Sequence, residues 1–114
     1  MIVEERTYLL RPGRTAEFLH AVETLGLPVL KPTLGGLIGY FVTEVGTLNQ
    51  VVHLWAYESL DDRARRRKLL AEHPGWQRFT DAVQPLFERM ETRVMTPAAF
   101  TPLTLEAVRA LGGG

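Results

Sequence analysis

The sequence predicts an α+β protein of the ferredoxin-like kind, in which a βαββαβ order forms one four-stranded antiparallel sheet with its helices on one face. A chain of 114 residues with 46% hydrophobic residues is long enough for one domain with a real core. Apolar residues recur with a strand or a helical period in that order along the chain. Two right-handed β-α-β crossovers, interleaved in this order, give an antiparallel sheet.

Proline and glycine separate the first two elements. A strand is expected over 2–10, which is rich in β-branched and aromatic residues and ends at an Arg-Pro-Gly sequence. A helix is expected over 13–25, where apolar residues recur at three- and four-residue spacing. We expect Gly26 to end this helix in a left-handed conformation and Pro28 to prevent its continuation, so that a loop leads to the next strand.

A hairpin and a second helix form the middle of the chain. Two apolar runs of strand length, 37–44 and 50–57, are joined by a short connection and are expected to pair antiparallel. A helix is expected over 60–72, because Ser59 is a favourable N-cap and two aspartates in the first turn complement the helix dipole.

A third helical segment, a final strand and a tail complete the chain. With a break expected at Pro85, an apolar helical stripe continues after the His-Pro-Gly corner through Trp76, Phe79, Val83 and Phe87. The final strand is expected over 90–95. Residues 1–103 then form the domain, and 104–114 form a loosely held tail with a short amphipathic stretch and three final glycines.

Composition and motifs exclude several classes of function. The 13 basic residues balance 13 acidic residues, and the pI is near 6.8, which argues against binding to nucleic acids or membranes. The absence of Cys excludes thiol chemistry, and the three His fit no metal-ligand spacing. No phosphate or dinucleotide motif is present, so no cofactor is expected. The first residues lack the order of a signal peptide, so a cytoplasmic location is expected.

Alternation along each strand sorts the strand residues into two sets on opposite sides of the sheet. The small apolar set of the third strand is expected to lie under the helices: Val52, Leu54 and Ala56. The polar and aromatic set is expected on the face away from the helices: Glu4, Arg6, Tyr8, Tyr40, Val51, His53, Trp55, Tyr57, Glu91 and Arg93. So many aromatic residues favour a covered surface, and we expect a second copy to cover it in a homodimer with a partly polar cavity between the sheets.

Some of these residues are candidates for chemistry. His53 is the candidate acid or base, because the usual pKa of histidine is near 6.5, and Tyr8 and Tyr57 are candidate catalytic hydrogen-bond donors. The candidate ligand-binding residues are Glu4, Arg6, Tyr40, Trp55, Arg63, Arg67, Glu91 and Arg93. A purely structural interface, with Arg6 and Arg93 paired to Glu4 and Glu91, explains the same residues equally well.

The basic run at 61–68 begins with two aspartates and fits a solvated flank of the second helix. Asp62 and Arg66 are four residues apart and are expected to pair. Arg63 and Arg67 share one helix face, from which they are expected to reach an anion or a partner carboxylate.

Several segments, in order, resemble the NIPSNAP family: Glu4-x-Arg6-Thr7-Tyr8, Arg11-Pro12-Gly13, the stretch from Gly39 to Tyr57, Asp62-Arg63, Arg67, Trp76 and Pro97-Ala98-x-Phe100. The resemblance covers residues 1–103 and implies a dimeric α+β barrel. Relatives of that barrel include cofactor-free monooxygenases, polyketide cyclases and haem-degrading enzymes, whereas the family itself has no agreed activity. Glu5 departs from the pattern, because such proteins more often carry an apolar residue there, on the helix-facing side of the first strand.

The favoured hypothesis is a homodimeric barrel that binds or converts a small aromatic or polyketide-like molecule without a cofactor. As an enzyme it would be a cofactor-independent monooxygenase, isomerase or cyclase. The alternative is a non-enzymatic interaction module that presents the 60–72 helix and the tail to a protein partner. Haem binding through His53 is the third and least favoured hypothesis.

Overall fold

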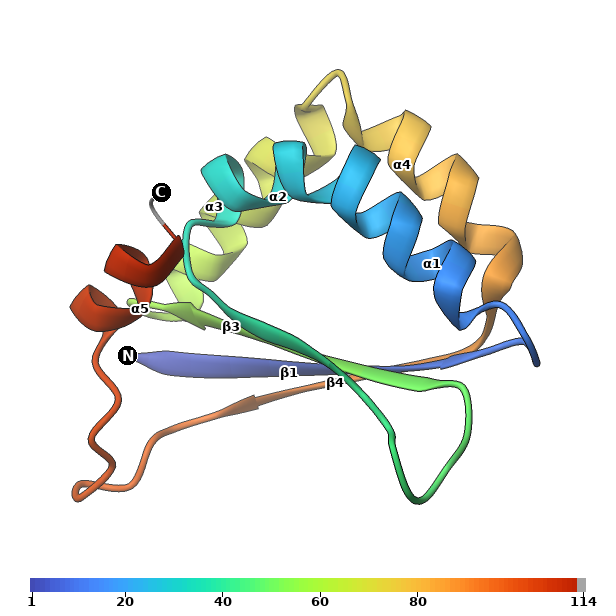
Figure 1. Cartoon of the computed structure of the whole chain (residues 1–114). Helices are drawn as coiled ribbons and strands as arrows, with labels where there is room; N and C mark the ends of the chain where they lie inside the picture. Colours follow the sequence, from blue (N-terminus) through green and yellow to red (C-terminus); the bar gives the residue numbers. More distant parts are fainter. Residues whose placement is uncertain (113–114) are drawn as a thin grey trace.

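The computed structural model describes residues 1–112 and has the predicted α+β fold. One antiparallel sheet, in the order β2-β3-β1-β4, lies below a layer of helices that all cover the same face (Figure 1). The strands are β1 (Ile2–Leu10), β2 (Leu37–Val42), β3 (Gln50–Tyr57) and β4 (Phe87–Met95). The α-helices are α1 (Thr15–Ala21), α2 (Leu27–Leu34), α3 (Leu60–Glu72), α4 (Trp76–Val83) and α5 (Leu105–Gly112).

The first helical region is longer than predicted. A π-helical segment, η1 (Val22–Gly26), joins α1 directly to α2, so the expected loop after Gly26 is wrong. Gly26 has right-handed backbone angles, and Pro28 lies in the first turn of α2, directly after this segment. The left-handed residue that ends the helix is Gly35, with φ of 76°.

The second helical region agrees more closely with the prediction. Helix α3 covers the predicted 60–72, and the Ser59 side chain accepts a hydrogen bond from the Asp62 N–H at 3.1 Å. Helix α4 ends at Val83, and the break predicted at Pro85 is a 3-10 turn over Gln84–Leu86. Phe87 then starts β4 instead of continuing the helical stripe, because the 3-10 turn returns the backbone to an extended conformation.

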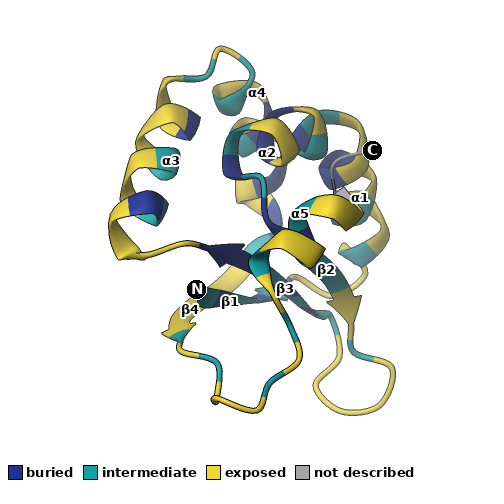
Figure 2. Cartoon of the chain, turned by 90° about the vertical axis from the view of Figure 1, so that its left-hand side faces the viewer, coloured by how far each residue is buried: buried dark blue, intermediate teal, exposed yellow. Residues whose placement is uncertain are grey.

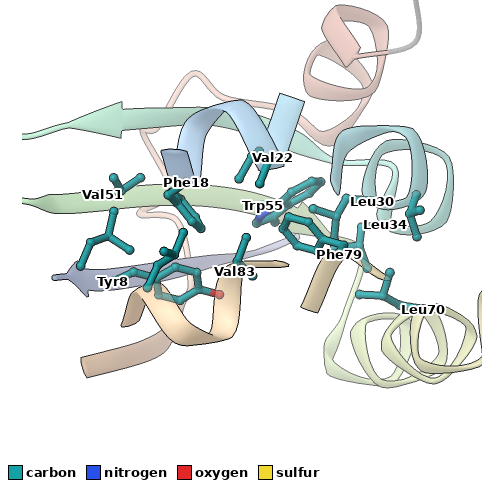
Figure 3. Packing of buried hydrophobic residues seen from close by; sticks show 14 of the residues in the cluster. Tyr8, Phe18, Val22, Leu30, Leu34, Val51, Trp55, Leu70, Phe79 and Val83 are labelled. Carbon is teal, nitrogen blue, oxygen red and sulfur yellow. The ribbon is translucent and has the colours of Figure 1, made fainter. Parts of the chain in front are cut away.

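The polar and aromatic set of strand residues faces the helices, so the predicted orientation of the sheet is wrong. Antiparallel pairing places Glu4 opposite Trp55 and Arg6 opposite His53. Figure 3 shows Tyr8 and Trp55 directed from their strands into the helix layer, close to Phe18 and other core residues. Large rings are needed there because they fill the space between a sheet and an arch of helices, which small side chains do not.

The opposite, open face of the sheet carries Glu91 and Arg93, which are therefore separated from the other predicted site residues. The register pairs Thr7 with Glu91 and Glu5 with Arg93, and Arg93 Nε donates to Glu5 Oε1 at 3.1 Å. Glu5 thus lies on the open face and not under the helices. The homodimer predicted from the sequence stays a prediction, and this open face is the surface that it would use.

The predicted tail carries helix α5, which packs against β2 and β3. Val108 is buried against the domain, whereas the outer side of α5 is exposed (Figure 2). This part of the tail is therefore anchored, whereas the last two glycines of the predicted tail lie outside the described residues. Within residues 1–112, no helix is long and apolar enough to cross a membrane.

Candidate functional site

A cavity of about 260 Å³ lies between the helix-facing side of the sheet and the helices above it. Its apolar walls are Phe18, Leu30, Leu34, Trp55, Trp76, Phe79, Val83, Phe87 and Met90. Its polar lining consists of Arg6, Tyr8, Tyr40, His53, Arg67, Thr80 and Gln84. This cavity is lined by residues of one chain, and a cavity between the sheets of two subunits stays a prediction.

His53 is the centre of the aromatic wall. Its ring stacks on Tyr40 with centroids 4.4 Å apart and planes 9° apart, and meets the edge of the Tyr8 ring at 4.7 Å. Trp55, two residues along β3 and therefore on the same face, donates its Nε1–H to His53 Nδ1 at 2.8 Å. Because Nδ1 accepts this bond, the proton of the neutral imidazole is on Nε2.

The environment of His53 argues against proton transfer by this ring at neutral pH. Burial and the nearby positive charge of Arg6 lower the pKa of His53 to about 3, although Glu4 acts in the opposite direction. The imidazole is therefore neutral at pH 7 and is a weak base. Its Nε2–H is buried and has no hydrogen-bond partner within residues 1–112, so its chemistry is that of a free donor.

His53 should make folding sensitive to mild acid. The unfolded chain binds a proton near pH 6.5 and the folded chain only near pH 3, so stability is full above pH 6.5 and falls below it. We expect the free energy of unfolding to decrease by about 1–2 kcal/mol between pH 7 and pH 5, measured by urea titration.

The matched variant for this test is His53→Asn, because the Asn side-chain oxygen can replace Nδ1 as the acceptor for Trp55. Its decrease over the same interval should be under about 0.5 kcal/mol. Burial raises the pKa values of Glu4 and Asp62, but hydrogen bonds from Arg63 to Glu4 and from the Glu58 N–H and Arg66 to Asp62 outweigh it and lower both values. The two carboxyl groups therefore titrate at lower pH and do not supply the pH dependence that the variant loses. Equal slopes for the two proteins would contradict the assignment.

A buried ion cluster lies beside the cavity. Glu4 Oε2 accepts hydrogen bonds from Arg63 Nη2 at 2.6 Å, Thr92 Oγ1 at 3.0 Å and Arg6 Nη1 at 3.3 Å, and Arg6 Nε also donates to the Tyr8 hydroxyl at 2.7 Å. Burial alone would raise the pKa of Glu4, but the Arg63 hydrogen bond and the Arg6 charge outweigh it and hold the pKa below 4.5. Glu4 is therefore ionised and holds β1, α3 and β4 together.

Tyr57 lies near this cluster and outside the cavity lining. Its side chain is fully buried, and its hydroxyl and Glu4 Oε1 both lack partners within the described residues. Burial and the charge of Glu4 raise the pKa of Tyr57 to about 12, so the phenol keeps its proton at neutral pH. The catalytic roles proposed for His53, Tyr8 and Tyr57 stay predictions.

The structure brings most of the predicted site residues together and rearranges their roles. The cavity lining includes Arg6, Tyr8, Tyr40, His53, Trp55 and Arg67. Glu4 and Arg63 belong to the adjoining ion cluster, and Tyr57 lies near it. Only Glu91 and Arg93 are elsewhere. Sequence reasoning missed Thr80 and Gln84 of the α4 region, because two isolated polar residues on a helix carry no chemical signal.

Three of the four arginines of α3 form ion pairs with carboxylates of the same chain. Arg65 and Arg66 donate to Asp62 at 2.6 Å and 2.9 Å, and the second of these is the pair predicted from spacing. Arg63 is bound to Glu4. This pairing occupies three of the four arginines of α3, and the interaction-module hypothesis stays a prediction. Among the described residues, no group of three His, Cys, Asp or Glu is placed to hold a metal ion.

Comparison with known proteins identifies the family. The NIPSNAP family model matches residues 3–102 of this chain. The chain belongs to the NIPSNAP family. Among curated NIPSNAP proteins, NipSnap homolog 1 of Danio rerio is 35% identical over 103 residues, which are 90% of this chain and 36% of that protein. NipSnap homolog 2 of Homo sapiens is 32% identical over 90% of this chain and 35% of its own length, so the chain spans about a third of these relatives.

Solved NIPSNAP structures have the same fold. An uncharacterised NIPSNAP-like domain protein from Burkholderia xenovorans is 50% identical with a TM-score of 0.86, and the match covers 90% of this chain and 89% of that one. A protein of Agrobacterium tumefaciens is 44% identical with a TM-score of 0.89, covering 91% and 100%. A Nitrosomonas europaea protein, provisionally named an antibiotic biosynthesis monooxygenase, is 15% identical with a TM-score of 0.64 over 85% and 98%, and therefore shares the fold alone.

Proposed function

We propose that this NIPSNAP chain binds a small aromatic molecule in the cavity between its sheet and its helices, without a cofactor. The observation that supports this most strongly is the cavity itself. At about 260 Å³, it is close to the lower limit of the range of about 300–1,000 Å³ that small-molecule sites occupy, which fits a ligand of one or two fused rings.

The lining of the cavity supports an aromatic ligand. Ring faces and edges surround the space from the sheet, with Tyr8, Tyr40 and Trp55, and from the helices, with Trp76 and Phe79. Aromatic side chains interact favourably with further rings in stacked or edge-to-face geometry. A few polar groups on mainly apolar walls are typical of sites that orient a small organic ligand.

Chemical conversion of the bound ligand is a further hypothesis, which goes beyond binding. The fold is shared with a protein provisionally named an antibiotic biosynthesis monooxygenase, which is compatible with conversion of a small molecule on this fold. A neutral His53 and the phenols of Tyr8 and Tyr40 offer hydrogen-bond donors to such a ligand. Donors of this kind would stabilise negative charge on a ligand oxygen.

Binding can be tested with 2-naphthalenemethanol as a probe. The chain has two tryptophans, and both line the cavity, so their indole N–H signals in a ¹H–¹⁵N NMR spectrum report its occupancy. We expect both signals to shift and saturate as the probe is added. A probe that leaves both indole signals unchanged up to its solubility limit contradicts the proposal.

A blocking variant makes this test specific to the cavity. Thr80→Phe places a ring in the space from α4, and we expect it to weaken binding of the probe at least about tenfold. The matched control is Thr47→Phe in the exposed connection between β2 and β3, which should bind like the original chain. Equal affinity of the two variants would place the probe outside the cavity.

A further inference from the structure

The charged residues of the cavity are all positive. Arg6 and Arg67 line it, whereas no Asp or Glu does among the described residues. Cations are costly in mainly apolar surroundings unless an anion balances them. The lining therefore distinguishes between ligands by charge, and this distinction rests on the proposed function of the cavity.

Arg6 is already balanced by the protein. Its Nε donates to the Tyr8 hydroxyl at 2.7 Å, its Nη1 contacts Glu4 Oε2 at 3.3 Å, and only 15% of its side chain is exposed. The sequence favoured Arg6 as the anchor for an anionic group of a ligand. In the structure its guanidinium instead binds Glu4 and Tyr8 in the buried ion cluster.

Arg67 has no acidic partner among the described residues. It lies one helical turn after Arg63, on the same side of α3, and is partly buried at the cavity lining. Arg63, Arg65 and Arg66 each bind a carboxylate, whereas Arg67 makes no ion pair or side-chain hydrogen bond with any residue of 1–112. A guanidinium has five N–H donors in a planar fork, which matches the two oxygens of a carboxylate.

A second unpartnered donor belongs to His53, which is also a lining residue of this cavity. The Nε2–H of His53 is buried, and 4% of the residue is exposed, so the protein provides no acceptor and bulk water has little access. A buried donor without an acceptor is unfavourable, and an oxygen of a bound ligand would remove this penalty. Arg67 and His53 line the same cavity, and the charge of Arg67 is one of those that lower the pKa of His53.

We infer that the ligand is an aromatic carboxylate, whose anionic group is bound by Arg67 and by the Nε2–H of His53 while its ring lies against the aromatic walls. Arg67 is then the residue that selects an acid over a neutral molecule of the same shape. His53 supports this selection as a neutral donor.

The test compares 2-naphthoate with 2-naphthalenemethanol, which has the same ring system without the charge, by isothermal titration calorimetry at pH 7. For the original chain we expect the acid to bind at least about tenfold more tightly. Arg67→Met should weaken the acid at least about tenfold and the alcohol less than about twofold. Arg67→Lys, which keeps the charge without the fork, should lie between, and His53→Asn should weaken the acid more than the alcohol.

The matched control is Lys68→Met, which removes one positive charge from the adjacent, exposed position of α3. It should leave both affinities unchanged. If the acid and the alcohol bind equally, or if Arg67→Met and Lys68→Met behave alike, the inference is overturned while the proposed cavity function stands. If neither compound binds, the proposed function fails and the inference fails with it.

Discussion

Replacing Glu4 with Ala is expected to lower the free energy of unfolding by about 3–5 kcal/mol. The Glu4 side chain is fully buried, and its Oε2 atom joins Arg6, Arg63 and Thr92 from three different elements. Its removal leaves two guanidinium groups, 15% and 25% exposed, without their counter-charge. The loss is measured by urea unfolding at pH 7, followed by circular dichroism.

The neighbouring glutamate provides the control. Glu5 lies on the opposite face of the same strand and pairs with Arg93, whose side chain is 68% exposed, so Glu5→Ala should cost no more than about 1 kcal/mol. Glu4→Gln keeps the shape and loses the charge, and should fall between the two alanine variants. Similar losses for Glu4→Ala and Glu5→Ala would show that the buried cluster contributes little.

Replacing Gly36 with Ala is expected to lower the free energy of unfolding by about 3 kcal/mol or more, or to prevent folding. A Cβ atom at Gly36 would lie 2.0 Å from the carbonyl oxygen of Ala56. Both partners are backbone, and the Ala56 N–H donates to the Gly36 carbonyl oxygen at 2.7 Å, so neither can move without loss of this hydrogen bond. The same urea titration gives the stability, and the yield of folded protein gives the severe case.

Gly13→Ala separates this contact from the general cost of losing a glycine. Gly13 has φ of +79°, which costs an L-residue about 1–2 kcal/mol. A Cβ atom there would meet nothing within 4 Å. We therefore expect Gly13→Ala to be clearly more stable than Gly36→Ala. The reverse order would mean that the backbone near Ala56 relaxes easily.

The sequence predicted most elements because their signals are local. The strand over 50–57 and the helix over 60–72 are confirmed at both ends, since alternation and an N-cap depend on residues close in the chain. The prediction of a loop after Gly26 was wrong because the helical backbone continues through this glycine into α2, which begins at Leu27. Phe79 packs so close to Gly26 that a Cβ atom there would lie 2.7 Å from its ring, which is a tertiary requirement for glycine.

The sequence also grouped most of the site correctly. Because side chains alternate along a strand, Arg6 and Tyr8 share a face whatever covers it, and so do His53 and Trp55. Antiparallel pairing then joins these two pairs on one side of the sheet. Glu91 and Arg93 were added to the wrong side, because the register between β1 and β4 cannot be counted from either strand alone.

The sequence by itself determined the order of the elements, the single sheet and the sharing of one face by the aromatic and charged residues of β1 and β3. Only the tertiary structure decided that this face lies under the helices and encloses a cavity, because both faces of the sheet carry apolar side chains and either one can be buried. It also decided which arginine is free. Arg6, Arg63 and Arg67 look alike in the sequence, and they differ because Glu4 is buried within reach of the first two and makes no ion pair with the third.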